Sequence, residues 1–551
     1  MLAAGRVDIN AYDRNGRTPL MVAVVSDGAP VEVVEFLLAS GADLQQTSRA
    51  QFEKGDPVAA LAVRAGDAGK VALLIRHGAD FRYTRAGNYD AIIDAAYSRS
   101  PQTTTLLKLL IAQGLTLNKI SAHNETALGQ LSRVGKFNEV ELLLDSGADP
   151  TSLGWTDLHR SVVLGSLEEV ASLISGGANL EERDKYDRTP FLLAAHSGDV
   201  AKAELLLQHG ANPRACGRFD EPAIFLAIEG HHDRMVSWLL RIGADAEQTN
   251  EFGSTPLITA VEQDNRHAIL ALLEAGVALE GQSYGQTALA HGKSREVIRQ
   301  LLDAGADPRQ LGFAAQRILV GLGESSEDPL LEISKEQFLD GRLRRFGRDN
   351  PERMDLPFWI AMIRSGASAY LGAEICDGSS GNRAGPVWSA HRFGQSLTRL
   401  PDGRIIQIAG EHEDHYDEDF CIYNDIFVHD TDGTVHIYGY PETVFPPIDF
   451  HTATLIGRFI YIIGSLGYQG TRQLGHTPVY RLDTDTLKID QFPTTGDMPG
   501  RIYGHRATHI SAHEIRISGG TIVTHDGSKE IHLPNDQVFV LDVDALIWRR
   551  Q

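Results

Sequence analysis

The sequence predicts a multidomain chain: an all-α solenoid, then a short helical connector, then an all-β segment of about three four-stranded units. Two periods predict this order. Before residue 309 a glycine-centred phrase returns with a modal spacing of 33 residues, and after residue 386 strand-like runs return with a spacing in the fifties. Repeating sequence is the signature of stacked structural units, so the periods decide the architecture before any single element does.

The first period is carried by the phrase Gly-Ala-Asp/Asn and its close variants. Most copies follow an apolar run at helical spacing, such as residues 31–40 and 200–209, which predicts a helix closed by a left-handed glycine. A shorter helix begins earlier in the unit, where Thr18, Thr189 and Thr255 can cap a first turn that opens with proline. The glycines are Gly41, Gly78, Gly114, Gly147, Gly177, Gly210, Gly243, Gly276 and Gly305.

These units resemble the ankyrin repeat, whose Thr-Pro-Leu core and later alanine occur at residues 18–23, 189–194 and 255–260. The resemblance implies a curved stack whose concave side, formed by hairpin tips and first helices, binds partners. We expect about nine repeats within residues 1–309, with residues 2–10 as the tail of a truncated further repeat. Repeats two, three and nine depart from the pattern, and we expect them to bend or loosen the stack.

A row of aromatic residues recurs at the expected hairpin tips. An exposed row of this kind would supply much of the energy of a protein interface. The alternative is that the rings only cover neighbouring turns and stabilise the stacking of the repeats. The row consists of Trp155, Tyr186, Phe219, Phe252 and Tyr284.

After the last repeat, residues 310–385 form a helical connector in this reading. Apolar residues at helical spacing in 330–346 and 358–371 predict two helices. Because the terminal unit of a repeat stack needs a cap with a polar outer face, we expect these helices to cap the ankyrin-like array.

Residues 386–551 change to β-branched and aromatic runs, such as 404–410 and 458–465, that predict strands. The runs return in three units, in which Gln395, His451 and His505 occupy equivalent positions. The order of strands resembles the kelch motif of galactose oxidase-like β-propellers, in which each unit is one four-stranded blade.

Three kelch-like units do not close a propeller, which normally has about four to eight blades. We therefore expect an open, partial propeller. Either a homodimer joins the open edges or the connector helices seal them; the further alternative is a chain shortened relative to its natural form.

Two features of the β segment are candidates for chemistry. The run from 411 to 419 is dense in imidazole and carboxylate, and His412, His415 and Asp417 are suitable ligands for a divalent metal, although a solvated turn has the same composition. The row Gln395, His451 and His505 either points polar groups at the propeller axis or joins strands by hydrogen bonds.

Composition narrows the classes of function. The net charge of -22 argues against a general affinity for nucleic acid or anionic membranes. No apolar run approaches the roughly 18 to 20 residues that span a bilayer, and three distant cysteines suit a reducing compartment. We expect a cytoplasmic protein.

The expected function is that of a non-enzymatic scaffold or adaptor, which binds other proteins through the ankyrin concave face and the kelch-like module. No catalytic residue is assigned, and no cofactor is expected. The alternative is a metal-binding protein, or an enzyme of unknown reaction, with its site in the His/Asp-rich part of the kelch-like segment.

Overall fold

The computed structural model describes residues 8–98, 100–322, 328–378, 387–412 and 420–551. The chain divides into two compact units, Met1–Gly285 and Gln286–Gln551. The ninth repeat thus groups with the C-terminal part, whereas the division by sequence pattern falls at residue 309. Within the described ranges, no helix has the length and apolar character that crossing a membrane requires.

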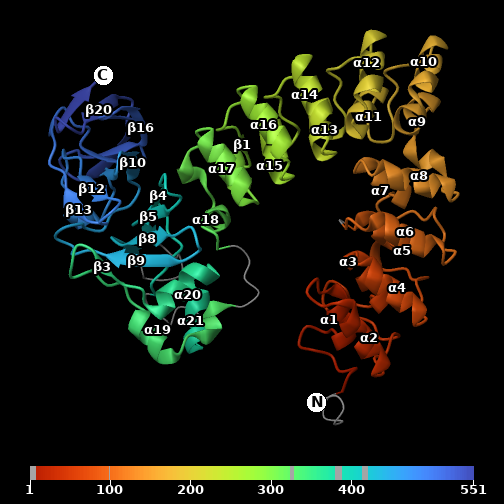
Figure 1. Cartoon of the computed structure of the whole chain (residues 1–551), viewed down its shortest axis with the longest axis horizontal. Helices are drawn as coiled ribbons and strands as arrows, with labels where there is room; N and C mark the ends of the chain where they lie inside the picture. The colour runs from red at the N-terminus through yellow and green to blue at the C-terminus, as the bar shows by residue number, and fades with distance from the viewer. Residues whose placement is uncertain (1–7, 99, 323–327, 379–386, 413–419) are drawn as a thin grey trace. The chain divides into compact units, whose positions relative to one another are not determined.

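The first unit is a stack of helix pairs, each made of a first and a second helix joined by a short turn (Figure 1). The pairs are α1 (Pro19–Val25) and α2 (Val31–Ala39), α3 (Val58–Ala65) and α4 (Ala68–Arg76), α5 (Ala91–Tyr97) and α6 (Thr103–Ile111), α7 (Ala127–Arg133) and α8 (Phe137–Asp145), α9 (Asp157–Leu164) and α10 (Leu167–Ser175), α11 (Pro190–Ser197) and α12 (Val200–Gln208), α13 (Ala223–Glu229) and α14 (Asp233–Arg241), and α15 (Pro256–Glu262) and α16 (Arg266–Glu274).

The turn chemistry predicted from the sequence is present in the structure. The hydroxyls of Thr18, Thr189 and Thr255 each accept a hydrogen bond from the backbone N–H three residues later, and proline follows each threonine. All nine repeat glycines adopt positive φ, between 65° and 99°. A Cβ added at any of them would meet no atom within 4 Å, so their backbone conformation, and not close packing, requires glycine.

Buried lysines join repeat two to repeat one and repeat six to repeat five. Lys70 Nζ donates to the carbonyl oxygens of Ala23 and Ser26 at 3.1 and 2.7 Å. Lys202 Nζ donates in the same way to Val162 and Gly165, at 2.9 and 2.8 Å. These carbonyls end the first helix of the preceding repeat, where backbone acceptors lack partners within the helix. The buried lysines are therefore caps between repeats.

The stack turns at repeat five, between α8 and α9 (Figure 1). Only 30 residues separate Gly147 from Gly177, and the 3₁₀ turn η3 (Pro150–Leu153) packs beside α7, whereas α9 packs beside α8. Repeat six then reaches repeat four directly, because Arg188 donates to the Ser132 carbonyl oxygen at 2.7 Å. The repeat that bends the stack is therefore repeat five, which differs from the sequence-based expectation for repeats two, three and nine.

The second unit begins with the ninth repeat, η5 (Ala288–His291) and α17 (Arg295–Asp303), and continues into the connector. The connector is more helical than expected. Its elements are η6 (Pro308–Gln310), α18 (Phe313–Leu319), η7 (Pro329–Glu332), α19 (Lys335–Gly341), β3 (Glu352–Arg353), α20 (Pro357–Ser365) and α21 (Ala369–Asp377).

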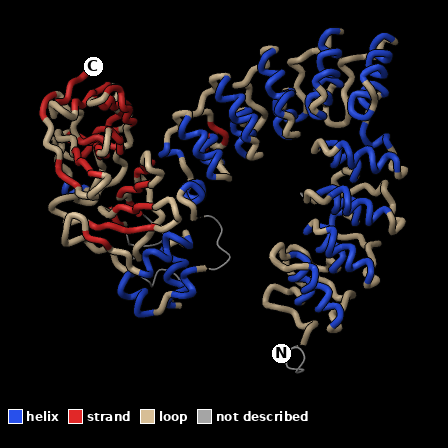
Figure 2. Tube along the Cα trace, viewed as in Figure 1, coloured by secondary structure: helices blue, strands red, loops and turns tan. Residues whose placement is uncertain are grey.

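Three sheets follow, each with a core of four antiparallel strands, coloured red in Figure 2. The first sheet gains β3 at its outer edge, and the third gains the parallel strand β14 (Thr495–Gly496). Every strand order is linear among the described residues, so no sheet closes into a barrel. The first sheet contains β4 (Ser396–Arg399), β5 (Ile405–Ile408), β8 (Ile426–His429) and β9 (Val435–Gly439); the second β10 (Thr452–Ile456), β11 (Phe459–Ile463), β12 (Val479–Asp483) and β13 (Ile489–Gln491); the third β16 (Arg506–Ser511), β17 (Glu514–Ser518), β20 (Val538–Asp542) and β21 (Ile547–Arg550).

Smaller strands complete the list: β1 (Gln282–Ser283) in the first unit, and in the second β2 (Gln286–Thr287), β6 (Glu411–His412), β7 (Cys421–Ile422), β15 (Arg501–Tyr503), β18 (Thr521–His525) and β19 (Glu530–Pro534).

The connector helices and the three sheets are stacked as layers. Trp359 of α20 stacks on Trp388 at 4.8 Å, in a core that also holds Phe427 from the first sheet. The opposite face of the first sheet packs on the second, and the second packs on the third, through cores of aliphatic and aromatic side chains. The outer face of the third sheet is polar instead: Arg516 and Arg549 are exposed there. A polar outer face is what ends a repeat series in water.

The first strands of the three sheets, β4, β10 and β16, are neighbours. Phe450 N–H donates to the Gly394 carbonyl oxygen, and Gly504 N–H donates to the Phe450 carbonyl oxygen, both at 2.8 Å. All three residues have positive φ, so the same turn recurs in each unit. Arg309 of η6 continues this series, since its guanidinium donates to the carbonyl oxygens of Gly504, at 3.3 Å, and His505.

The other end of the series meets the same segment of the chain. Gln395, next to β4, donates to the side-chain oxygen of Gln316 in α18 at 2.8 Å. Arg399 of β4 pairs with Asp303 of α17 at 2.8 Å. The end of the ninth repeat and α18 therefore contact both the first and the third sheet. Whether the connector helices or a second copy complete the β segment stays a prediction.

We predict that Lys202→Met lowers the free energy of unfolding by about 1–3 kcal/mol, because two buried carbonyl oxygens lose a charged donor. Chemical denaturation measures the change. Lys108→Met is the matched control: Lys108 is exposed on α6, and its loss should change stability by less than about 0.5 kcal/mol. Equal effects of the two substitutions would contradict the role of Lys202 as a cap.

Candidate functional site

The hairpin tips of the repeats are shaped by a polar residue at their base. The Asp184 carboxylate accepts from the backbone N–H groups of Tyr186 and Arg188, at 2.8 and 2.9 Å. Asn250 accepts in the same way from Phe252 and Ser254, each at 3.0 Å. Such side-chain caps hold tight turns, and they place an aromatic residue at the tip.

The aromatic row is exposed only in its C-terminal part. Tyr284 is 82% exposed and Phe252 43%, and the Phe219 ring lies 5.3 Å from the Phe252 ring. Trp155 is half-buried beside Phe137, and Tyr186 is only 3% exposed. The Tyr186 hydroxyl donates to Glu125 of repeat four at 2.8 Å, because the short fifth repeat brings these tips together.

A cavity of about 90 Å³ is lined by Phe219, the ring that contacts Phe252. It is enclosed by the tips of repeats six and seven together with the ends of first helices from repeats four and seven. The sequence does not predict this cavity, because it depends on the direction in which the stack bends at repeat five. Its lining is Arg133, Tyr186, Arg188, Gly217, Arg218, Phe219, Glu221, Leu226 and Glu229.

The negative charges of two carboxylates in this cavity, Glu221 and Glu229, are not balanced by an ion pair with any residue that the structure describes. Burial, and then the charge of Glu229, raise the pKa of Glu221 to about 7, although Asn250 and Arg133 lower it. Burial also raises the pKa of Glu229. Neither glutamate forms an ion pair within 4 Å among the described residues. Their ionised forms thus lack a cation at ion-pairing distance, and the Arg133 and Arg188 charges act on Glu229 only from farther away.

A second, larger cavity of about 450 Å³ lies where repeat five is short. Leu117, Ile120 and Leu128 give it an apolar wall. Its one cation in the lining is already engaged: Lys185 donates to the Asn124 carbonyl oxygen at 3.0 Å and pairs with Glu125 at 3.2 Å.

The metal ligands suggested by the sequence are only partly placed. His415 and Asp417 lie outside the described residues. His412 is buried at the end of β6, and its Nδ1 shares a hydrogen bond with the His391 carbonyl oxygen at 3.2 Å. The described residues thus supply one of the three side chains, so the metal site remains a prediction.

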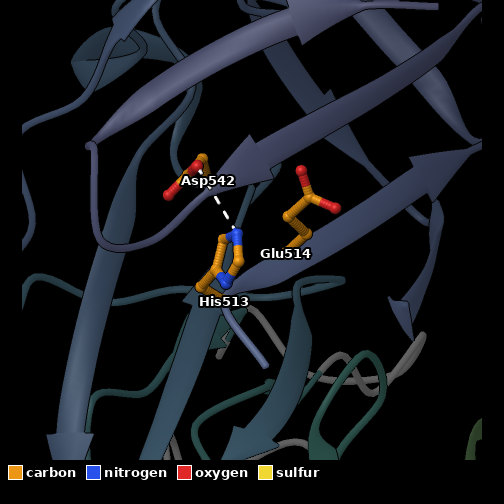
Figure 3. Close-up of side chains that lie close together, drawn as sticks. All are labelled: His513, Glu514 and Asp542. Carbon is orange, nitrogen blue, oxygen red and sulfur yellow. Dashed lines mark ion pairs between the residues drawn. The ribbon is translucent and has the colours of Figure 1, made fainter. Parts of the chain in front are cut away.

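Another cluster, at the outer face of the third sheet, brings together His513, Glu514 and Asp542, with ligand atoms within 4.8 Å of one another. Figure 3 shows the two carboxylates on opposite sides of the His513 ring. Arg549 pairs with Glu514 at 2.6 Å and lowers its pKa. Because a guanidinium this close repels a cation, the arrangement favours an ion-paired strand end over a metal centre.

The polar row of the β segment joins adjacent sheets. His451 Nε2 shares a hydrogen bond with the Ser396 hydroxyl at 2.8 Å, and His505 Nε2 with the Thr452 hydroxyl at 2.9 Å. Burial lowers the pKa of both imidazoles to about 3, so both are neutral near pH 7. Gln395 contacts Gln316 instead. These contacts correspond to the structural alternative for the row.

Comparisons with known proteins identify the helical repeats. The family model "Ankyrin repeats (3 copies)" matches residues 130–215 and 224–311, and the model "Ankyrin repeat" matches residues 15–49. The chain therefore contains ankyrin repeats, as their resemblance predicted. Ankyrin repeats form extended surfaces that bind other proteins, so this part of the chain is a protein-binding array.

Three curated proteins show partial similarity. An ankyrin repeat domain-containing protein SAT10 of Stachybotrys chartarum is 29% identical over 168 residues, which is 30% of this chain and 8% of that protein. The 2-5A-dependent ribonuclease of Mus musculus is 35% identical over 75 residues, 13% of this chain and 10% of the ribonuclease. The ankyrin repeat protein nuc-2 of Neurospora crassa is 31% identical over 159 residues, 29% of this chain and 14% of nuc-2. The chain thus spans a small fraction of each relative.

We predict that Glu221→Gln stabilises the protein strongly at pH 8 and only slightly at pH 5. The pKa of Glu221 is near 7 in the fold and near 4.5 when unfolded, so the native state binds the extra proton between these values and loses stability as pH rises through them. Glutamine removes that loss. Thermal unfolding at both pH values measures it, and a destabilisation of equal size at pH 5 and pH 8 would contradict the buried, uncompensated carboxylate.

Proposed function

We propose that this protein is a non-enzymatic scaffold that holds a partner protein on the hairpin tips and first helices of ankyrin repeats six to eight and on the following tip, which carries Tyr284. The observations that carry the proposal are the exposed rings of Phe252 and Tyr284 at successive hairpin tips, the contact of Phe252 with Phe219, and the glutamate-lined cavity that Phe219 lines. Aromatic side chains supply much of the energy of interfaces. Tyr186 lines the same cavity from within the stack.

We further propose that the β segment is a kelch-type series of three blades that serves as a second binding module. Three findings support this: the four-stranded antiparallel sheets, the recurring left-handed turn at Gly394, Phe450 and Gly504, and the hydrogen bonds between neighbouring first strands. Its edges are occupied by β3, β14 and Arg309. A single chain therefore accounts for the series without a second copy.

The location that we propose is the cytoplasm, with neither nucleic acid nor membrane as a partner. The three cysteines form no disulfide, and the chain carries a net charge of -22. Free cysteines are typical of proteins in a reducing compartment. The negative net charge disfavours polyanionic partners.

The test is affinity capture with the full-length chain, followed by quantitative mass spectrometry. We predict that Phe252→Ser/Tyr284→Ser loses about 90% or more of the specifically captured partner, because two anchors each worth about 1 kcal/mol or more are removed. Phe36→Ser/Leu270→Ser is the matched control, since these side chains are exposed on second helices. Unchanged recovery with the Phe252/Tyr284 variant would reject the proposed surface.

A further inference from the structure

We propose that the bound partner presents a basic segment, and that the cavity between repeats four, six and seven takes one lysine or arginine side chain of that segment. The proposal rests on the binding surface proposed above and specifies the chemistry of its occupant.

The charge of repeats six to eight is unevenly distributed between the two sides of the stack. The tips and first helices, residues 184–198, 217–230 and 250–264, carry eight acidic and three basic residues. The second helices of the same repeats, residues 200–208, 233–241 and 266–274, carry three acidic and four basic residues. The acidic excess thus belongs to the side that carries the exposed rings, and complementary charge sets partner choice and association rate.

The cavity fits the end of a cationic side chain. Its 90 Å³ equals the space of about three water molecules in the liquid. Glu221 and Glu229 line it, and both would gain from a positive charge that neither has at ion-pairing distance. Tyr186, Phe219 and Leu226 form its remaining walls, where methylene groups and a cation facing aromatic rings are favourable.

The arginines that line the cavity do not make it an anion site. Arg188 is already bonded to Asp184 and Ser132, at 2.7 Å in each case. The Arg133 guanidinium donates to the Gln130 side chain, and that of Arg218 lies over the Phe219 ring at 4.8 Å. An anion in the cavity would also face both glutamates, so a cation is the complementary occupant.

The protonation equilibrium of Glu221 supports a cation as the occupant of the cavity. Its pKa is raised to about 7, in surroundings that contain Glu229, Arg133, Asn250, Arg188 and Arg218. A bound cation favours the ionised carboxylate, so cation binding and protonation compete. Affinity for a basic segment should therefore increase between pH 6 and pH 8.

The experiment is selection of a random 12-residue phage-displayed peptide library on the immobilised full-length protein at pH 8, with synthesis of the enriched peptides and fluorescence anisotropy. We expect peptides that contain lysine or arginine and bind about tenfold or more weakly to E221Q/E229Q. E141Q/E274Q, which removes two exposed carboxylates from second helices, should bind within about twofold of wild type.

The outcomes separate this inference from the proposed surface. Enriched peptides that lack basic residues, or that bind E221Q/E229Q as well as wild type, overturn the inference. If such peptides still lose binding to Phe252→Ser/Tyr284→Ser, the surface itself stands. Equal loss in E221Q/E229Q and E141Q/E274Q means non-specific attraction to a negative chain and also overturns it. Unchanged thermal unfolding of each variant at pH 8, apart from the stabilisation expected for E221Q, excludes misfolding.

Discussion

The hydrogen bonds of Arg309 and Gln316 with the β segment are the interaction on which the second unit depends. A repeat unit cannot bury both of its faces alone, so each series needs an end that a different structure covers. Arg309 donates to Gly504, just before β16 of the third sheet. Gln316 accepts from Gln395, just before β4 of the first sheet. One short segment thus ends the ankyrin stack and closes off the sheets, which explains why the ninth repeat groups with the C-terminal unit.

The same constraint explains where function is expected. In the β segment, the polar groups that recur in each sheet, such as His451 and His505, are buried and neutral and join strands. In the ankyrin array, the short fifth repeat lets Tyr186 reach Glu125, and this long-range contact makes a cavity instead of a uniform surface. The candidate site therefore lies where the regular stack is interrupted, and it is joined to the exposed Phe252 ring through Phe219.

Much of the fold is readable from the sequence because local chemistry repeats with it. Thr189 caps a helix and Gly210 ends one for reasons that lie within a few residues, and each recurs at the repeat spacing. The candidate site is less readable. The shortened fifth repeat was visible as a spacing of 30 residues, but the meeting of Arg133 and Glu221, 88 residues apart, depends on the direction of the bend it causes. Likewise, the sequence around each tyrosine does not predict that Tyr186 is buried whereas Tyr284 is exposed.

Hydrogen exchange of the full chain tests most directly whether one segment ends both series. The account predicts that R309A/Q316A speeds exchange by about tenfold or more in β4 and β16 together, since several hydrogen bonds of about 1 kcal/mol are lost at both ends of the sheet series. Exchange in α1 to α8 should not change. Faster exchange confined to residues 305–320, with β4 and β16 as protected as in the wild type, would contradict the account.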